Sequence, residues 1–580
     1  MINFLLTILM FLFSVFSFAQ TATGTTVSTD HTFDKGSLVN LQKLSKTQVR
    51  DLAVLGKVWG FLKYYHPKAN SGTLNWDYEL FKVMPEVLSS KNESDRNKIL
   101  LSWTSTLGDF PKKTETKENN EVRYKPDLQW ISKKSLGNDL SELLMNISKA
   151  DRKAENHYVK IYSEDMPIPY FQNEAAYSQF KYPDTGFRLL SLYRYWNMIE
   201  YFYPYKNTLE KSWDKTLEDL IPKFVEADNE VSYRLAVASM IAEIQDSHAV
   251  SSVWSEAPLY DQQGKMRPAV DFVFVGNKPV VSESLEEKNG NKNELLKGDE
   301  IISVNQKPVE DILRERLPYA SASNTPTRLA RIGVSLLRTN DPYIEVGIKR
   351  SGAAKVIKVK TLPLEKSLIE ESTSEPAFRM QTKDIAYIHP GRLDVKQLDS
   401  IMKTAVKTKA IIIDMRTYPK ETMFLMKIGE YLFEKPRDFC RMTKGNAVMP
   451  GQFSYLSDEY MSNVKIGKDN PDYYKGKLIV LCNDNTQSFA EMSLMAFRAG
   501  PNTTIIGSQT AGADGNVTAP ILLPGNIRTV FTGIGMYNLN GTETQRIGIV
   551  PDIEAKPSIQ GLAENKDEVL ERAVRFANGM

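Results

Sequence analysis

Ser488 occupies a place in the sequence where a hydroxyl group could act as a nucleophile. The apolar run KLIVLCN is typical of a buried strand, and NDNTQ then leads into SFAEMSLMAF, whose apolar residues have helical spacing. A serine at such a strand-to-helix turn lies beside the free N–H groups of a helix start, which can bind the oxyanion of an acyl transfer. Ser488 with Glu491 three residues later also matches a capping box, so a purely structural role stays open.

A second polar group stands out because part of the chain is repeated. Four residues of one segment recur 137 positions later: Trp59 as Trp196, Pro67 as Pro204, Trp76 as Trp213 and Pro85 as Pro222. We interpret this as a duplicated helical region. The same offset aligns Asp109 with Asp246, and only the second copy continues with Ser247 and His248. A neutral imidazole can take a proton from a serine, which makes His248 a candidate general base.

The elements around these residues fall into three kinds. From Asp51 to about Asp109, apolar side chains recur at helical spacing, whereas residues 111–180 are charged and irregular and predict a long loop with edge strands. Residues 260–365 contain short strand-like runs, and LLKGDEIISVNQKPVEDIL at 295–313 resembles the late strand and helix of a PDZ domain. From about residue 375, apolar strands alternate with amphipathic helices, which predicts a mostly parallel sheet covered on both faces.

Composition excludes several classes of protein. A chain of 580 residues with 42% apolar residues has room for several cores and is not disordered. Its 73 Lys and Arg against 71 Asp and Glu leave a formal charge of +2, so we expect no nucleic-acid partner. Cys440 and Cys482 are too few for a disulfide framework or a zinc site, and no motif for a cofactor or metal occurs.

The N-terminus predicts export. Residues 1–19 have no charged side chain, and Ser17 and Ala19 place small residues before a cleavage point, as in a signal peptide. The apolar run of about 16 residues is shorter than the roughly 20 of a membrane-spanning helix. We therefore expect a periplasmic or extracellular protein that is not an integral membrane protein, with residues 20–45 as an extended lead-in.

A series of short motifs resembles one family of proteases. GDEIISVN, IAYIHPGRL, AIIIDMRTYP, IVLCNDNTQSFAEM, IIGSQTAGA, LPGNIRTVFTGIGMYNLNG and RIGIVPDIE occur in the order found in the C-terminal-processing (tail-specific) serine proteases. The resemblance extends to the tricorn core protease-like and retinoid-binding-protein-like branch. It implies a multidomain α+β chain with a duplicated helical region, a PDZ-like β domain and a ClpP/crotonase-like α/β protease core.

The resemblance also implies the roles of individual residues. Ser488 matches the family nucleophile, but Ala513 stands where the Ser/Lys branch has its lysine, so that dyad is broken. The tricorn-like branch uses a Ser-His pair from the preceding helical region, which matches Ser247 and His248.

The remaining roles carry over less directly. The last acid would be Glu543, favoured because only a carboxylate can hold an imidazolium by charge, or Gln545, which is in frame with the motif. The oxyanion hole would use the backbone N–H groups of Phe489 and Lys420.

These observations predict a domain order and a function. The predicted segments are a signal peptide (1–19), a lead-in (20–45), helical repeat 1 (46–150), helical repeat 2 with the DSH motif (151–259), a PDZ-like domain (260–368) and the catalytic core (369–580). We expect a serine endopeptidase that cleaves peptides or unfolded or C-terminal segments. The alternative is an inactive relative that binds a peptide or an apolar ligand in the same cleft. An α/β-hydrolase esterase is disfavoured because no GxSxG surrounds Ser488.

Overall fold

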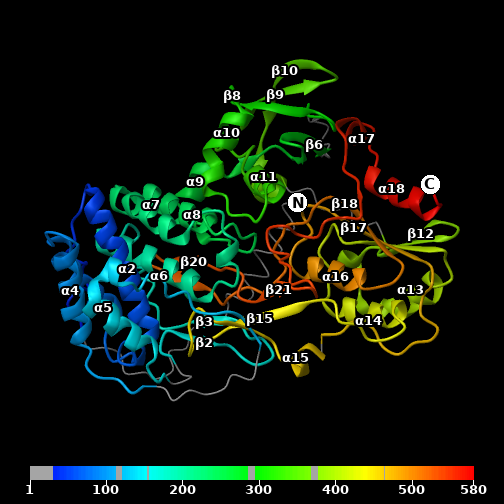
Figure 1. Cartoon of the computed structure of the whole chain (residues 1–580). Helices are drawn as coiled ribbons and strands as arrows, with labels where there is room; N and C mark the ends of the chain where they lie inside the picture. The colour runs from blue at the N-terminus through cyan, green and yellow to red at the C-terminus, as the bar shows by residue number, and fades with distance from the viewer. Residues whose placement is uncertain (1–29, 113–120, 153–155, 285–293, 368–375, 463) are drawn as a thin grey trace.

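The structure is a computed structural model of the whole chain (Figure 1). It describes residues 30–112, 121–152, 156–284, 294–367, 376–462 and 464–580. The predicted signal peptide and the first ten residues of the lead-in lie outside the described residues. The described part of the lead-in, from residue 30 to residue 45, forms no helix or strand and contains a turn at 32–35, so the extended lead-in stays a prediction.

The helical region contains the same run of elements twice. The first run is α2 (Lys46–Tyr65), the 3₁₀ turn η1 (Ala69–Ser71), α3 (Trp76–Leu88) and α4 (Glu93–Ser105). The second is α6 (Thr185–Phe202), η2 (Lys206–Thr208), α7 (Trp213–Glu226) and α8 (Glu230–Ala242). In each run the two tryptophans bond reciprocally, indole N–H to backbone oxygen, at 2.8 and 3.0 Å for Trp59 and Trp76 and 2.9 and 3.0 Å for Trp196 and Trp213. The two runs therefore share this pair of bonds, while the duplication itself stays a prediction.

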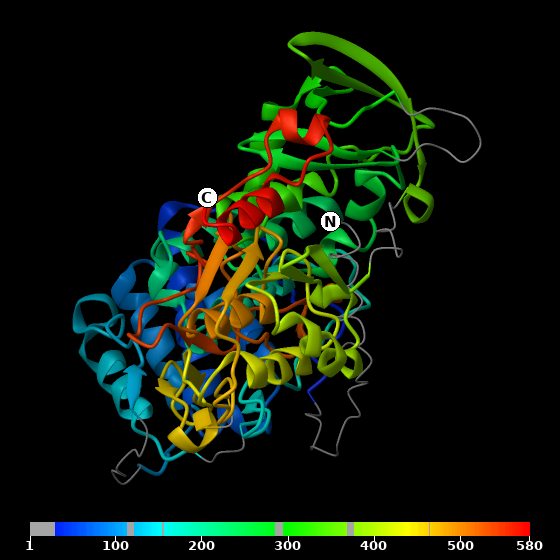
Figure 2. The same cartoon turned by 90° about the vertical axis from the view of Figure 1, so that its right-hand side faces the viewer.

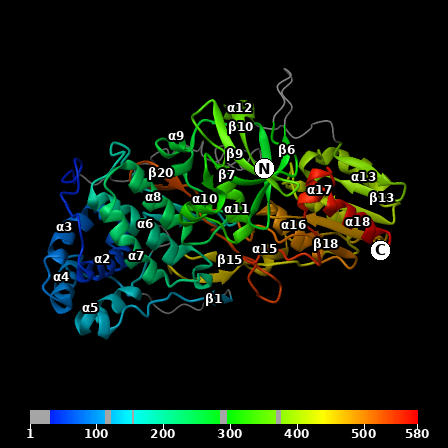
Figure 3. The same ribbon diagram turned by 90° about the horizontal axis from the view of Figure 1, so that it is seen from above.

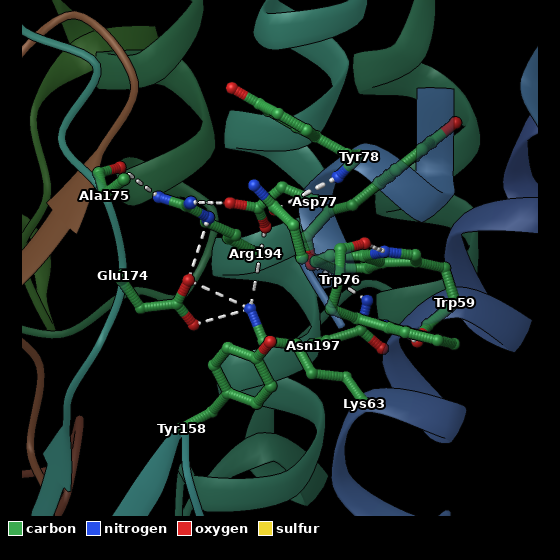
Figure 4. Close-up of polar contacts among 12 residues, drawn as sticks. Trp59, Lys63, Trp76, Asp77, Tyr78, Tyr158, Glu174, Ala175, Arg194 and Asn197 are labelled. Atoms are coloured by element: carbon green, nitrogen blue, oxygen red, sulfur yellow. Dashed lines mark hydrogen bonds and ion pairs between the residues drawn. The ribbon is translucent and has the colours of Figure 1, made fainter. Parts of the chain in front are cut away.

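The two runs contact each other through equivalent residues. Lys57 pairs with Asp214 at 2.8 Å, and Arg194 pairs with Asp77. Under the 137-residue offset, Lys57 is equivalent to Arg194 and Asp77 is equivalent to Asp214. Only the second pair is enclosed: Arg194 and Asp77 are buried with Glu174, which bonds the Arg194 Nε at 3.0 Å and the Lys63 ammonium at 2.7 Å. Figure 4 shows these four charged side chains converging between the helices. Two cations and two anions thus balance inside the helical region.

Residues 111–180 differ from the predicted loop because they include a long helix, α5. This helix (Lys133–Ser148) buries Leu136, Leu140, Leu144 and Ile147 and packs against α4. Gly137 interrupts the helix with a left-handed φ of 73°, which obscured the pattern in the sequence. The same stretch also contributes three short strands: β1 (Val122–Tyr124), β2 (Val159–Ile161) and β3 (Pro169–Phe171). The predicted edge strands are therefore present.

The middle of the chain forms a β-rich unit with its own core, which projects at the top of Figure 2. Its sheet has the order β10-β9-β7-β6-β5, all antiparallel, with β8 paired to β7. The strands are β5 (Val270–Val275), β6 (Lys278–Ser284), β7 (Glu300–Val304), β8 (Lys307–Pro308), β9 (Tyr343–Arg350) and β10 (Ala353–Lys360). The helices are α10 (Val309–Arg316), the 3₁₀ turn η4 (Leu317–Tyr319) and α11 (Thr325–Gly333). The strands match the predicted runs, while the PDZ-like assignment stays a prediction.

Short elements border this unit. They are the 3₁₀ turn η3 (Ser252–Trp254), α9 (Leu259–Gln263), β4 (Met266–Arg267), β11 (Leu362–Pro363) and α12 (Leu364–Ser367), and β4 pairs with β11.

The C-terminal core is built on a six-stranded sheet of order β12-β13-β14-β17-β18-β22, parallel except for β12. The strands are β12 (Phe378–Thr382), β13 (Ile385–Ile388), β14 (Ala410–Asp414), β17 (Lys477–Cys482), β18 (Thr503–Gly507) and β22 (Ile553–Glu554). Alternate residues of β14 point to opposite sides, with Ile411 and Ile413 in one core and Ile412 in the other. The mostly parallel sheet predicted from the sequence is therefore present, and it is buried on both faces.

Helices cover both faces of this sheet. One face packs against α13 (Leu398–Ala405), α14 (Met423–Leu432) and α16 (Phe489–Arg498), and the other against α18 (Glu568–Ala577). The core also contains the 3₁₀ turns η5 (Pro390–Arg392) and η6 (Val395–Gln397) and the short helices α15 (Asp458–Ser462) and α17 (Ile559–Ala563).

Smaller sheets join the core to the helical region. One has the order β1-β16-β15-β21, and so combines a strand from the helical part with β15 (Arg441–Gly445), β16 (Phe453–Tyr455) and β21 (Gly535–Tyr537). The hairpin of β19 (Ile521–Leu523) and β20 (Ile527–Thr529) packs against the helical region. Figure 3 shows the helices at one end of the molecule and the core at the other, so these strands cross between them. No helix among the described residues is long and apolar enough to cross a membrane.

Candidate active site

Ser488 lies where the sequence predicted it, between β17 and the first residue of α16. Its φ of 59° is in the left-handed region, which a residue with a side chain adopts only when its surroundings impose it. The Ser488 N–H donates to the carbonyl oxygen of Ala513 at 2.9 Å, and the hydroxyl of Thr486 in the same turn donates to Met415 O at 2.9 Å. The turn is thus held by two neighbouring segments, and the side chain of Ser488 is half-buried.

Glu491 connects the start of α16 to the loop after β18. Its carboxylate accepts the N–H groups of Gly512 at 2.8 Å, Ala513 at 2.9 Å and Ser488 at 3.2 Å, together with the hydroxyl of Thr510. Burial raises the pKa of Glu491 to about 7, against these hydrogen bonds. The interaction expected of a capping-box acid is therefore present, and it also fixes the 510–513 loop.

Asp514 is a buried acid without a counterion beside this loop. Neither carboxylate oxygen has a hydrogen-bond partner within the described part of the chain, and the neighbouring Thr544 hydroxyl donates to Met536 O instead, at 3.1 Å. Burial, reinforced by the charge of Glu491, raises the pKa of Asp514 to about 8. At neutral pH Asp514 is mainly protonated, so it does not replace the missing lysine as a base.

His248 follows α8 and is enclosed by the core. Its Nδ1 lies 2.9 Å from the hydroxyl oxygen of Thr532, and its backbone N–H donates to Asp246 Oδ1 at 2.9 Å. Burial lowers the pKa of His248; the Asp246 charge opposes this shift and the Arg331 charge adds to it. The imidazole is therefore neutral at neutral pH, which is the form that a general base requires.

Ser247 does not orient the imidazole, in contrast to the role implied by the family resemblance. Its hydroxyl donates to Ala511 O at 2.8 Å and accepts the Ser323 N–H at 2.8 Å. Its own N–H donates to the Ser323 hydroxyl at 2.8 Å. Among the residues described, no hydrogen bond joins the Ser247 hydroxyl to His248. Ser247 instead connects its own loop to the loops of Ala511 and Ser323.

The loops that carry Ser488 and His248 are in contact. The side-chain amide of Gln487, next to Ser488, donates to the carbonyl oxygen of Ser247 at 3.2 Å. Asn324 donates to Thr510 O at 2.7 Å and so ties the β-rich unit to the same place. No hydrogen bond between the Ser488 hydroxyl and His248 is present in the described part of the chain. Such bonds are often long in the absence of substrate and do not exclude the pair.

Gln545, and not Glu543, belongs to the His248 cluster, which corrects the expected fourth member. The Gln545 amide donates to Asp246 Oδ1 at 3.1 Å and is fully buried. Glu543 instead accepts from Arg123 at 2.7 Å and from Tyr124 at 3.1 Å, on the sheet that joins core and helical region. A carboxylate would stabilise the imidazolium by its charge, but the backbone directs the side chain of Glu543 away from His248 and toward Arg123 and Tyr124. The acid beside His248 is Asp246.

Comparison with known proteins identifies the core. Residues 384–555 match the model of peptidase family S41. The match supports a serine-type peptidase. It includes Ser488 and Gln545 but not His248, which precedes it.

Solved structures resemble the chain at low sequence identity. Mature CPAF complexed with lactacystin is 13% identical, with a TM-score of 0.52 over 68% of this chain and 99% of that chain. The photosystem II D1 C-terminal processing protease is 15% identical, with a TM-score of 0.35 over 66% of this chain and 98% of that chain. The CPAF likeness supports a shared fold. No protein of curated function matches the sequence.

The oxyanion hole differs from the one expected from the sequence. The Phe489 N–H begins α16, as predicted, but the Lys420 N–H is already bonded to Pro390 O at 3.1 Å. From the same turn, the phenol of Tyr418 approaches both the Ser488 hydroxyl and the Phe489 N–H. Burial raises the pKa of Tyr418, which keeps its O–H available as a donor. A turn without glycine thus presents a side-chain hydroxyl where a backbone N–H was expected.

Four residues that the sequence did not single out lie around the candidate site: Thr532, Tyr418, Arg331 and Ser323. They reach it from separate elements, and no spacing in the sequence connects them to Ser488 or His248. Within the described residues no group of three or more His, Cys, Asp or Glu side chains is placed to hold a metal ion.

Proposed function

We propose that the chain is an exported serine endopeptidase that hydrolyses peptides or unfolded and C-terminal segments of proteins, with Ser488 as nucleophile and His248 as general base. The observation that carries the proposal is the strained backbone of Ser488 at the start of α16. It is supported by the contact between Gln487, next to Ser488, and Ser247, next to the buried and neutral imidazole of His248. Strained backbone conformations are concentrated at active sites, where the surrounding structure holds a reactive side chain in place.

The reaction would proceed by two proton transfers through His248. The Ser488 oxygen attacks the scissile carbonyl while Nε2 of His248 takes its proton, and the Phe489 N–H with the Tyr418 O–H stabilises the oxyanion. The imidazolium then returns the proton to the leaving amine as the C–N bond breaks. Water attacks the acyl-enzyme in the same way, and the acid leaves Ser488 with its proton restored.

Export and substrate class rest on the sequence. The signal peptide expected at 1–19 supports a periplasmic or extracellular site, and the PDZ-like segment at 295–313 supports recognition of chain termini by strand addition. An exported peptidase without a metal motif would need only its own side chains for the chemistry.

Labelling with a fluorophosphonate probe and hydrolysis of unfolded casein test the proposal. Ser488→Ala should abolish both, since it removes the attacking oxygen, while circular dichroism stays that of the wild type. Ser493→Ala is the matched control, because the Ser493 hydroxyl on the same helix only bonds Phe489 O at 2.7 Å. Wild-type protein that neither labels nor cleaves would favour the inactive peptide-binding relative.

A further inference from the structure

Thr532 stands between the imidazole of His248 and the carboxylate of Asp246. It lies between β20 and β21 and is completely buried. Its hydroxyl oxygen is 2.9 Å from His248 Nδ1 and 3.0 Å from Asp246 Oδ1, and its N–H donates to Asp246 Oδ2 at 2.7 Å. His248 and Asp246 precede Thr532 in the sequence by 284 and 286 residues.

The number of available protons decides the direction of these bonds. A carboxylate only accepts, and Asp246 Oδ1 already accepts the His248 N–H and the Gln545 amide. The 3.0 Å contact between Thr532 and Asp246 is favourable only if the threonine hydroxyl donates to the carboxylate. The threonine oxygen then accepts from His248, so the ring proton is on Nδ1 and the lone pair is on Nε2.

Packing restricts the hydroxyl to this arrangement. A Cβ added at Gly515 would lie 2.8 Å from Cγ2 of Thr532, so the threonine methyl group packs against this glycine. The Gly533 N–H donates to Asn516 O at 2.7 Å and holds the backbone beside it. With the methyl group confined, the hydroxyl of Thr532 points at Asp246 and His248.

We propose that Thr532 is the positioning residue of His248. Its hydroxyl links Nδ1 of the imidazole to the Asp246 carboxylate by two hydrogen bonds, so that no carboxylate bonds the imidazole directly. This deepens the proposed peptidase function and rests on it. Thr532 sets the tautomer that leaves Nε2 able to accept the Ser488 proton. When the imidazolium forms, Nδ1 keeps its proton, and the Asp246 charge stabilises the cation through the polarised hydroxyl.

The charges around Asp246 suit such a relay. Arg331 is half-buried, and the hydrogen bonds found for it among the described residues go to the carbonyl oxygens of Ser247 and Ser321 rather than to the carboxylate. Gln545 brings a neutral amide to Asp246. The negative charge of Asp246 therefore faces the threonine hydroxyl without a cation hydrogen-bonded to it.

Three variants test the relay. Thr532→Val keeps the shape but removes the hydroxyl, and should lower kcat about 100-fold with KM little changed; Thr532→Ser should recover activity to within about 10-fold of the wild type. Thr529→Val is the matched control, because Thr529 is equally buried and bonds Val250 O at 2.9 Å without touching His248. It should retain wild-type kcat.

A direct reading of the tautomer complements the kinetics. In protein labelled with ¹⁵N-histidine, with the His248 signals assigned by loss in His248→Gln, the wild type should show the proton on Nδ1. This measurement needs folded protein but no activity, and it decides the matter if Thr532→Val does not fold.

Two results would overturn the relay: a wild-type proton on Nε2, or folded Thr532→Val with kcat within threefold of the wild type. In the second case, inactive Ser488→Ala would leave the proposed peptidase intact. Activity unchanged in Ser488→Ala would instead remove the peptidase mechanism itself, so the two failures are distinguishable.

Discussion

At the scale of single residues, Gln545 and Glu543 are two positions apart but serve different parts of the molecule. Gln545→Glu would place a second carboxylate about 3 Å from the buried Asp246, and the repulsion should disturb the His248 cluster. We expect kcat to fall at least about 10-fold. Glu543→Gln loses only a half-exposed ion pair with Arg123, and should keep kcat within about twofold. Steady-state hydrolysis of one peptide by both variants measures this.

The reverse ranking would assign the role to Glu543. A strong loss in Glu543→Gln with a silent Gln545→Glu would mean that the segment carrying Glu543, which contacts Arg123 and Tyr124, rearranges when substrate binds. Thermal unfolding of both variants serves as the control for misfolding.

The role of Tyr418 in the oxyanion hole can be tested by removing one atom, its phenol oxygen. Tyr418→Phe removes the hydroxyl near Ser488 and the Phe489 N–H but keeps the ring, which lies 6.4 Å between centroids from Phe489. Loss of one oxyanion donor typically costs about 100-fold in kcat, and we expect a loss of that order with KM little affected. An increase in the rate of fluorophosphonate labelling would instead identify the phenol as an obstacle in the oxyanion site.

At the scale of elements, the contact between the two helical runs offers a matched comparison. Asp77 and Asp214 are equivalent under the 137-residue offset and each accepts from a cation of the other run. Asp77→Asn leaves the buried Arg194 and Lys63 without one of two balancing charges, so the free energy of unfolding should fall by about 3 kcal/mol or more. Asp214→Asn, at an exposed pair, should cost under about 1 kcal/mol.

Urea unfolding followed by circular dichroism measures this difference. Equal losses in the two variants would mean that burial does not distinguish the pairs. Because His248 directly follows the second run, a destabilised contact should also accelerate loss of activity on heating.

At the scale of the whole molecule, the buried acids determine how stability depends on pH. The folded pKa of Asp514, about 8, lies above its unfolded value of 3.8, so the folded state binds its proton more tightly. Stability contributed by this proton is present below about pH 4 and is lost as pH rises toward 8, by up to about 1.4 kcal/mol per pH unit.

Asp514→Asn removes this dependence. The wild type should lose more stability than the variant between pH 5 and pH 8, and the two curves should approach each other at lower pH. Asp438→Asn is the control, because Asp438 is an exposed partner of Lys465 at 3.2 Å. Parallel curves for the wild type and Asp514→Asn would show that Asp514 is already ionised in the folded protein.

Much of the architecture was predictable because local patterns suffice for it. Continuous apolar runs between helical segments predicted β14, β17 and β18 as neighbours in a parallel sheet, and the tryptophan repeat predicted the two helical runs. Helix α5 was missed because Gly137 interrupts its first turn, and only packing of Leu140 and Leu144 against α4 makes the segment helical. The missed helix changes none of the site residues.

The sequence by itself determined the family motifs, the position of Ser488 at a helix start and the separate DSH motif. Each depends on residues close together in the chain, whose backbone geometry follows from neighbours. Only the tertiary structure decided which side chain faces His248. Thr532 is 284 positions from the histidine, and Glu543 and Gln545 differ by two positions, yet a turn of the backbone sends them to different partners. Contacts between distant segments depend on how whole elements pack, and no local spacing records them.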